Sequence, residues 1–209
     1  MRNKGRGFKG ELKSSFLSCE KDTETIIRKL FVDSSPYSDI LKALLVINTP
    51  DVLTASGSIN QNPEYLKKLK EMTLKQLRDQ GYIRLEPKLK FGENNEVKSY
   101  ILITFDNFSP TKSNEYYRDC IVMIDVICHS DYWDLGNYRL RPFQICGIID
   151  GILDGTKLSG IGTFNFLGCN EIVLSEALAG YCLTYSATHG VDDLIKEADE
   201  DEQEEPVTP

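Results

Sequence analysis

The clearest hydrophobic pattern in the chain lies between Arg139 and Gly190. Apolar residues within Phe143–Leu153 recur every two to four positions, which predicts one buried helix face. Arg141–Pro142 suits the first turn of that helix, and Gly155 stands where a left-handed cap would end it. Three short alternating or apolar stretches typical of strands follow, at residues 163–166, 171–174 and 181–185. The region therefore predicts a helix packed on a sheet.

Three further helices are predicted upstream, where apolar residues again recur at helical spacing. The first begins at Asp22, a residue type that caps helices, and stops at Ser34–Pro36. The second covers Tyr37–Ile47. The third begins at Asn62–Pro63 and ends at Gly81, so the N-terminal part of the chain is predicted to be helical.

From Tyr82 onward the hydrophobic period changes from helical to two. Residues 82–91 form a candidate strand, which Pro87 restricts to an edge or a bulge. Residues 99–105 form a second strand, and a polar loop is expected over 106–114. Residues 120–128 are the most apolar of these strands, so we expect them at the centre of the sheet.

The order of elements is typical of an α+β domain, with a largely antiparallel sheet, a central helix packed on it and N-terminal helices on the same side. The 209 residues leave room for one such domain. We expect a basic flexible arm over residues 1–20 and a disordered acidic tail over 191–209. The single domain would cover 21–190, with a helical part over 21–81 and a sheet part over 82–190.

The net charge of −8 lies in the tail rather than in the body of the chain. Residues 191–209 hold nine acidic residues and one lysine, so the remaining residues are neutral overall. The first 13 residues hold five basic residues and one acidic residue. This arm could dock on nucleic acid or on an acidic partner, or it could be a solvated terminus. Because the body is neutral and the tail acidic, strong DNA binding is not expected.

The six cysteines favour free thiols in a reducing compartment. None forms a CxxC pair, and several stand inside apolar runs, where cysteine behaves as a small hydrophobic residue. The basic N-terminus lacks the continuous apolar core of a signal peptide. No segment approaches the run of about 20 apolar residues that spans a membrane, so no membrane association is expected.

One cluster could carry chemistry: Asp125, His129, Asp131 and Asp134 fall within ten residues of one another. On a strand, Asp125 and His129 share a face, whereas the two later aspartates fall in a turn, where aspartate is favoured for local hydrogen bonds. The structural interpretation is that these residues shape the turn. The alternative is a small metal-dependent phage or bacterial enzyme, such as a nuclease, that uses Asp125, His129 and Asp131.

Other catalytic patterns are weak. Gly160–Gly162 precedes a strand and lacks the further glycine of a dinucleotide-binding loop. A nucleophile–histidine–acid system could use only His129 or His189, and no serine is indicated by its surroundings. We therefore expect no catalytic, cofactor-binding or metal-binding residues, no cofactor and no enzymatic activity.

About half of the chain resembles a known family. The resemblance rests on CIVMIDVICHSDYWDL (residues 120–135), RLRPFQICGIIDGILDG (139–155) and residues 161–190. In this pattern a strand ends near a histidine and a tryptophan, and an "RPF" helix and a glycine-rich turn follow. It resembles the tail terminator and head–tail joining family of tailed-bacteriophage neck proteins. The helical segment between Asp33 and Gly81 and the acidic tail are additional to the compact form of that family.

The resemblance implies a structural virion protein, assembled in the host cytoplasm, that forms a ring between tail and head. A hexamer would have a mass of about 142 kDa, since one chain is 23.7 kDa. Its partners would be the tail tube protein and neck or connector proteins, with DNA only passing through the channel. The residues expected to contact subunits or partners are Arg2, Lys4, Arg6, Lys9, Tyr82, Arg84, Asp106, Lys112, Trp133 and Arg139.

Overall fold

Strand β3 (Tyr117–His129) lies at the centre of a five-stranded sheet with the order β1-β2-β3-β7-β6. The structure is a computed structural model that describes residues 15–85, 99–111 and 117–190. All pairings in this sheet are antiparallel except that of β1 with β2, which is parallel. The other four strands are β1 (Ile83–Arg84), β2 (Tyr100–Pro110), β6 (Asn165–Val173) and β7 (Leu178–Gly190). The predicted α+β domain with a largely antiparallel sheet is confirmed.

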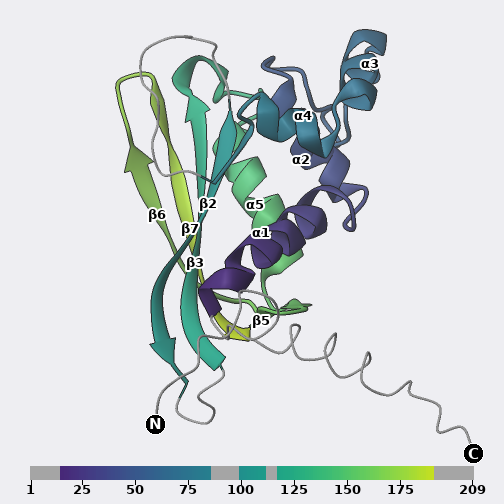
Figure 1. Cartoon of the computed structure of the whole chain (residues 1–209). Helices are drawn as coiled ribbons and strands as arrows, with labels where there is room; N and C mark the ends of the chain where they lie inside the picture. The colour runs from purple at the N-terminus through teal and green to yellow at the C-terminus, as the bar shows by residue number, and fades with distance from the viewer. Residues whose placement is uncertain (1–14, 86–98, 112–116, 191–209) are drawn as a thin grey trace, which may run out of the picture.

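The helices form a layer on one side of this sheet (Figure 1). Helix α5 contacts β3 and β7, and α1 and α2 contact α5 in turn. The helices are α1 (Ser15–Phe31), α2 (Tyr37–Val46), α3 (Pro63–Glu71), α4 (Leu74–Asp79) and α5 (Arg141–Leu153). Three small elements complete the described chain: the 3-10 helix η1 (Ser130–Tyr132), and β4 (Lys157–Leu158) paired with β5 (Gly162–Thr163). The predicted packing of a 141–154 helix on the sheet is therefore confirmed, with α5 ending at Leu153.

The alternating sequence of β3 turns one face of the strand into the core. The residues Cys120, Val122, Ile124, Val126 and Cys128 are buried and belong to the main core. The core also takes the apolar side of α5, with Ile145 and Ile149 fully buried. Each fully buried aliphatic side chain contributes about 1.5–3 kcal/mol, so the contact between α5 and β3 is a major source of stability.

Gly180 permits the close contact between β7 and β3. It pairs with Ile127 in the antiparallel ladder. A Cβ atom at Gly180 would lie 1.8 Å from the backbone oxygen of Val126, a distance that no side chain can occupy. Any larger residue would force the two longest strands of the sheet apart.

Two predictions about the helices were wrong. Helix α1 begins at Ser15, so Asp22 lies inside it and is buried instead of capping it, and residues 15–20 belong to the helix rather than to an arm. The predicted 62–81 helix is two helices, because Thr73 starts α4 with a capping box that it forms with Gln76. Residues 1–14 and 191–209, where the rest of the arm and the tail were predicted, lie outside the described residues.

The strand predictions also need correction. Residues 106–110 continue β2 past an irregularity between Asp106 and Ser109, although a polar loop was predicted there. The predicted strands 163–166 and 171–174 are largely parts of one strand, β6, whose register shifts between Phe166 and Gly168. Of the predicted 82–91 strand, the structure assigns Ile83–Arg84 as β1, and residues 86–91 lie outside the described part. The extent of β2 and β6 is set by pairing with β3 and β7, and the alternation of neighbouring residues does not predict such long-range pairing.

Among the helices of the described residues, none has the length and apolar character needed to cross a membrane.

Candidate functional site

The residues predicted to contact partners fall into two groups. Arg2, Lys4, Arg6, Lys9 and Lys112 lie outside the described residues. Within the described part, Tyr82 is buried, so its side chain packs in the core rather than facing a partner. Asp106 is exposed on β2. Arg84 lies with its guanidinium carbon 3.9 Å from the centre of the Tyr100 ring, which is a cation–π contact within the chain.

Trp133 and Arg139 hold the chain together internally. The Trp133 indole donates a hydrogen bond of 3.2 Å to the Cys128 carbonyl, and its half-buried ring packs against the core. Arg139 donates through Nη2 to the Thr54 carbonyl at 2.9 Å. In the described part of the chain, the contacts of Trp133 and Arg139 join neither of them to Arg84 or Asp106, so these predicted residues do not form one site.

Arg141 is a structural residue that the sequence did not reveal. It is fully buried, and its guanidinium donates to the carbonyl oxygens of Tyr132, Leu44, Ile47 and Thr49 at 2.6–2.9 Å. Two of these carbonyls belong to the C-terminal end of α2, where a cation is favoured. Burial lowers the pKa of Arg141 to about 10, which leaves it charged at neutral pH. The residue thus joins the start of α5 to the end of α2.

The acidic cluster does not form a metal site in the described part of the chain. His129 Nδ1 accepts a hydrogen bond from the Asp131 amide at 3.3 Å and so caps η1. Asp125 lies opposite Cys182 in the ladder between β3 and β7, and burial raises the pKa of its carboxyl. No group of three or more His, Cys, Asp or Glu side chains in the described ranges is placed to hold a metal ion. The arrangement therefore gives no support to the nuclease alternative.

Strand β6 offers the most exposed apolar surface of the sheet. It pairs with β7 on one side and has no strand of the described chain on the other. Phe166, Leu167 and Val173 are 42%, 55% and 68% exposed. Figure 1 shows β6 at the margin of the sheet, away from the helical layer. A long edge strand with unpaired backbone groups and exposed apolar side chains is a template for pairing with another chain.

The opposite margin of the sheet is also open, but it has a different form. There β1 has only two residues, which pair with Ile101 and Leu102 of β2. Beyond this pairing, residues 103–110 have no strand of the described chain on the side away from β3. The sheet therefore has two unlike edges, one formed by β6 and one by β1 with the rest of β2.

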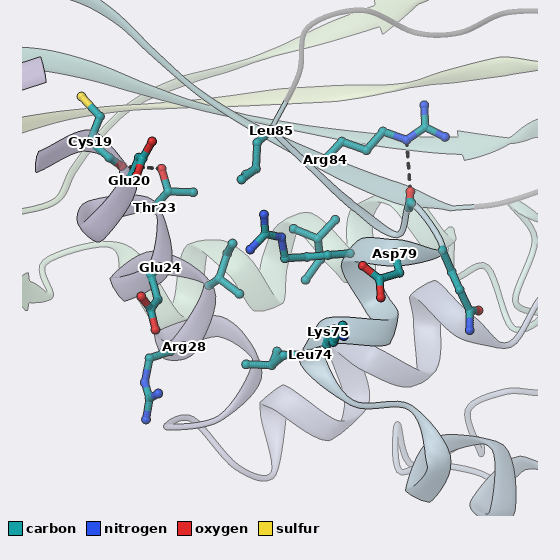
Figure 2. Close-up of a pocket in the computed structure, with 15 residues that line it drawn as sticks. Cys19, Glu20, Thr23, Glu24, Arg28, Leu74, Lys75, Asp79, Arg84 and Leu85 are labelled. Atoms are coloured by element: carbon teal, nitrogen blue, oxygen red, sulfur yellow. Dashed lines mark hydrogen bonds between the residues drawn. The ribbon is translucent and has the colours of Figure 1, made fainter. Parts of the chain in front are cut away.

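A groove of about 1460 Å³ runs between α1, α4 and β1 (Figure 2). Its lining carries both signs of charge. The acidic residues are Glu20, Glu24 and Asp79, and the basic residues are Arg28, Lys75, Arg78 and Arg84. Mixed charges of this kind do not focus a field of one sign, so the groove does not select an anionic ligand such as nucleic acid.

A comparison with known protein families gives a match. The family model YomW matches residues 38–187, which cover most of the chain, from the second residue of α2 to residue 187 in β7. No curated protein matches the chain.

Proposed function

Because the chain belongs to the phage-associated YomW family, we propose that it is a structural protein of the phage neck. In this proposal it is a tail terminator or head–tail joining subunit that forms a ring, caps the tail tube and connects it to the head. The phage-associated family and the resemblance in residues 120–135, 139–155 and 161–190 support this role. The single observation that carries it is the exposed apolar edge of β6.

The two unlike edges of the sheet favour a ring over a two-fold dimer. If β6 of one copy meets the β1–β2 edge of the next, the contact is heterologous, and such a contact closes into a ring when the rotation between copies allows it. Backbone hydrogen bonds would then extend the sheet from subunit to subunit. Burial of Phe166, Leu167 and Val173, at about 25 cal/mol per Å² of apolar surface, would add to the affinity.

The role needs no chemical step, so in this proposal the chain has no enzymatic activity, cofactor or resident metal. The ring would contact the tail tube protein on one face and neck or connector proteins on the other. DNA would pass through the central channel without sequence-specific contacts. The protein would act in the virion after assembly in the host cytoplasm.

The first test measures the mass and location of the full-length chain. We expect light scattering to give an oligomer near 142 kDa for six copies of 23.7 kDa, and electron microscopy to show a central hole. Antibody labelling of virions should mark the junction of head and tail. A compact monomer at every concentration, together with virions that carry no label at the neck, would contradict the proposal.

The second test asks whether β6 is the contact. Cys169 lies exposed on β6, so its alkylation by iodoacetamide should slow at least tenfold when the ring forms. Leu167→Lys should place a charge in the interface, abolish the ring and leave Cys169 reactive at every concentration. Leu66→Lys is the matched control, because Leu66 is 38% exposed on α3, away from both sheet edges, and this variant should still assemble. A ring that survives Leu167→Lys would show that the interface lies outside the β6 edge.

A further inference from the structure

Cys19 and Asp22 on α1 meet His189 on β7 in the folded chain. Cys19 and Asp22 are three residues apart on α1, a spacing that places side chains on one helix face. His189 belongs to β7 and lies 170 positions after Cys19. Its Nε2 is 3.9 Å from the Cys19 sulfur, and its Nδ1 contacts Asp22 Oδ2. The order is thiol, imidazole, carboxylate.

Burial makes the orientation of His189 specific. His189 is fully buried and Asp22 is 1% exposed. In the tautomer that carries its proton on Nδ1, that N–H points to the Asp22 carboxylate and the lone pair of Nε2 faces the thiol. The ring of Phe108 meets the imidazole edge-on, with 5.7 Å between centroids, and Phe105 lies 6.5 Å away. These apolar rings lower the local dielectric and so strengthen the polar contacts.

Cys19 remains reachable from outside. It is half-buried and lines one end of the groove between α1, α4 and β1. Figure 2 shows it at the α1 end of that groove, beside Glu20, with its sulfur pointing away from the other lining residues. A small neutral reagent suits such a thiol, because the Glu20 carboxylate would repel an anionic one.

The other five cysteines lack this arrangement. Burial raises the pKa of the Cys120 and Cys182 thiols to about 12, that of Cys128 to about 11, and that of Cys146 further still. The thiol of exposed Cys169 also has a raised pKa, through partial burial and the nearby Asp150 carboxyl. Thiols with raised pKa values are poor nucleophiles at neutral pH, since the thiolate is the reactive form.

We propose that Cys19 is a reactive thiol, with His189 as its base and Asp22 as the residue that positions the base, and that it reacts with small disulfides. The Cys19 proton passes to His189 Nε2 as the sulfur attacks one sulfur of the disulfide. A new S–S bond forms to Cys19 and the original S–S bond breaks. The released thiolate takes up a proton, and the chain carries a mixed disulfide that a second thiol can remove. This site is independent of the β6 edge and of the proposed neck role.

The test uses full-length protein and the neutral reagent 2-hydroxyethyl disulfide, with adducts located by peptide mass spectrometry. It is done in the Leu167→Lys background, so that assembly does not shield Cys169. We expect Cys19 to form its adduct at least tenfold faster than Cys169, despite its lower exposure. General-base assistance is worth about 10²–10⁴-fold, so this margin is a cautious one. A reaction at Cys19 that is equal to or slower than that at Cys169 would overturn the proposal. This comparison leaves Cys19, Asp22 and His189 unsubstituted.

Two variants then separate the roles. His189→Gln should slow the Cys19 adduct at least tenfold and leave the Cys169 rate unchanged. Asp22→Asn should slow it less, because an amide oxygen can still accept from Nδ1 but does not stabilise the imidazolium. Labelling of the buried Cys128 and Cys146 reports unfolding. If a variant unfolds, the comparison of Cys19 with Cys169 in protein without substitutions at the site decides the proposal. An unchanged Cys19 rate in folded His189→Gln would also overturn the proposal.

Discussion

The junction between α2 and α5 differs from the edge strand β6 in whether its polar and apolar groups find partners within the described chain. At the junction, a fully buried cation, Arg141, donates to four backbone carbonyls of its own chain. On β6, Leu167 and Val173 are more than half exposed, and one backbone side has no partner strand in the described residues. The first region completes its interactions within the chain, whereas the second leaves apolar surface and hydrogen-bonding groups for a contact outside it.

The largest expected effect comes from breaking the junction. Arg141→Ala removes a buried cation and leaves the carbonyls of Leu44, Ile47 and Thr49 without their donor, so we expect a loss of about 3–5 kcal/mol in the free energy of unfolding. Urea denaturation measures it. Arg28→Ala is the matched control, because Arg28 is exposed on α1 and its loss should change stability by about 0.5 kcal/mol or less. Equal effects in the two variants would show that the four hydrogen bonds contribute little.

An intermediate effect on the free energy of unfolding is expected at Asp125, which is half-buried on the face of β3 opposite the core. Burial raises the pKa of this carboxyl, and its contact with Cys182 opposes the shift only partly. The raised pKa means that folding disfavours the ionised form. Asp125 therefore lowers stability above the unfolded-state pKa of about 3.9, and this effect disappears as the pH falls below it.

Asp125→Asn tests this direction. At pH 7 the variant should be more stable than the parent by about 1 kcal/mol or less, since solvent screens a half-exposed group. The difference should shrink to zero as the pH is lowered toward 3 in urea titrations. Asp106→Asn, at an exposed position on β2, is the control and should show no comparable gain. A variant less stable than the parent at pH 7 would mean that the contact with Cys182 outweighs burial.

The smallest effect on stability is expected at the edge itself. Leu167→Lys should change the free energy of unfolding of the monomer by about 0.5 kcal/mol or less, because the side chain is 55% exposed. The same substitution is expected to abolish assembly, so stability and assembly separate at this position. Urea denaturation of the monomer is the measurement. A loss above about 1 kcal/mol would show that β6 packs for stability and is not a free contact surface.

Local patterns predicted the elements whose faces are set by near neighbours. The 141–153 helix and the central 120–128 strand were predicted because their apolar residues recur at regular spacing. The same reasoning failed at Asp22, since an aspartate just before an apolar helix face has the pattern of a cap. In the folded chain it is buried against His189, more than 160 positions away. Polar residues 106–110 likewise became strand because β3 pairs with them.

From its sequence alone, this protein could be recognised as an α+β domain whose helix lies on a mostly antiparallel sheet, because side-chain periodicity depends on residues a few positions apart. The tertiary structure alone decided which margins of the sheet stay open, which carbonyls Arg141 meets, and that Cys19, Asp22 and His189 share one place. Those features depend on contacts between distant segments, and such contacts form only when the whole core closes around them.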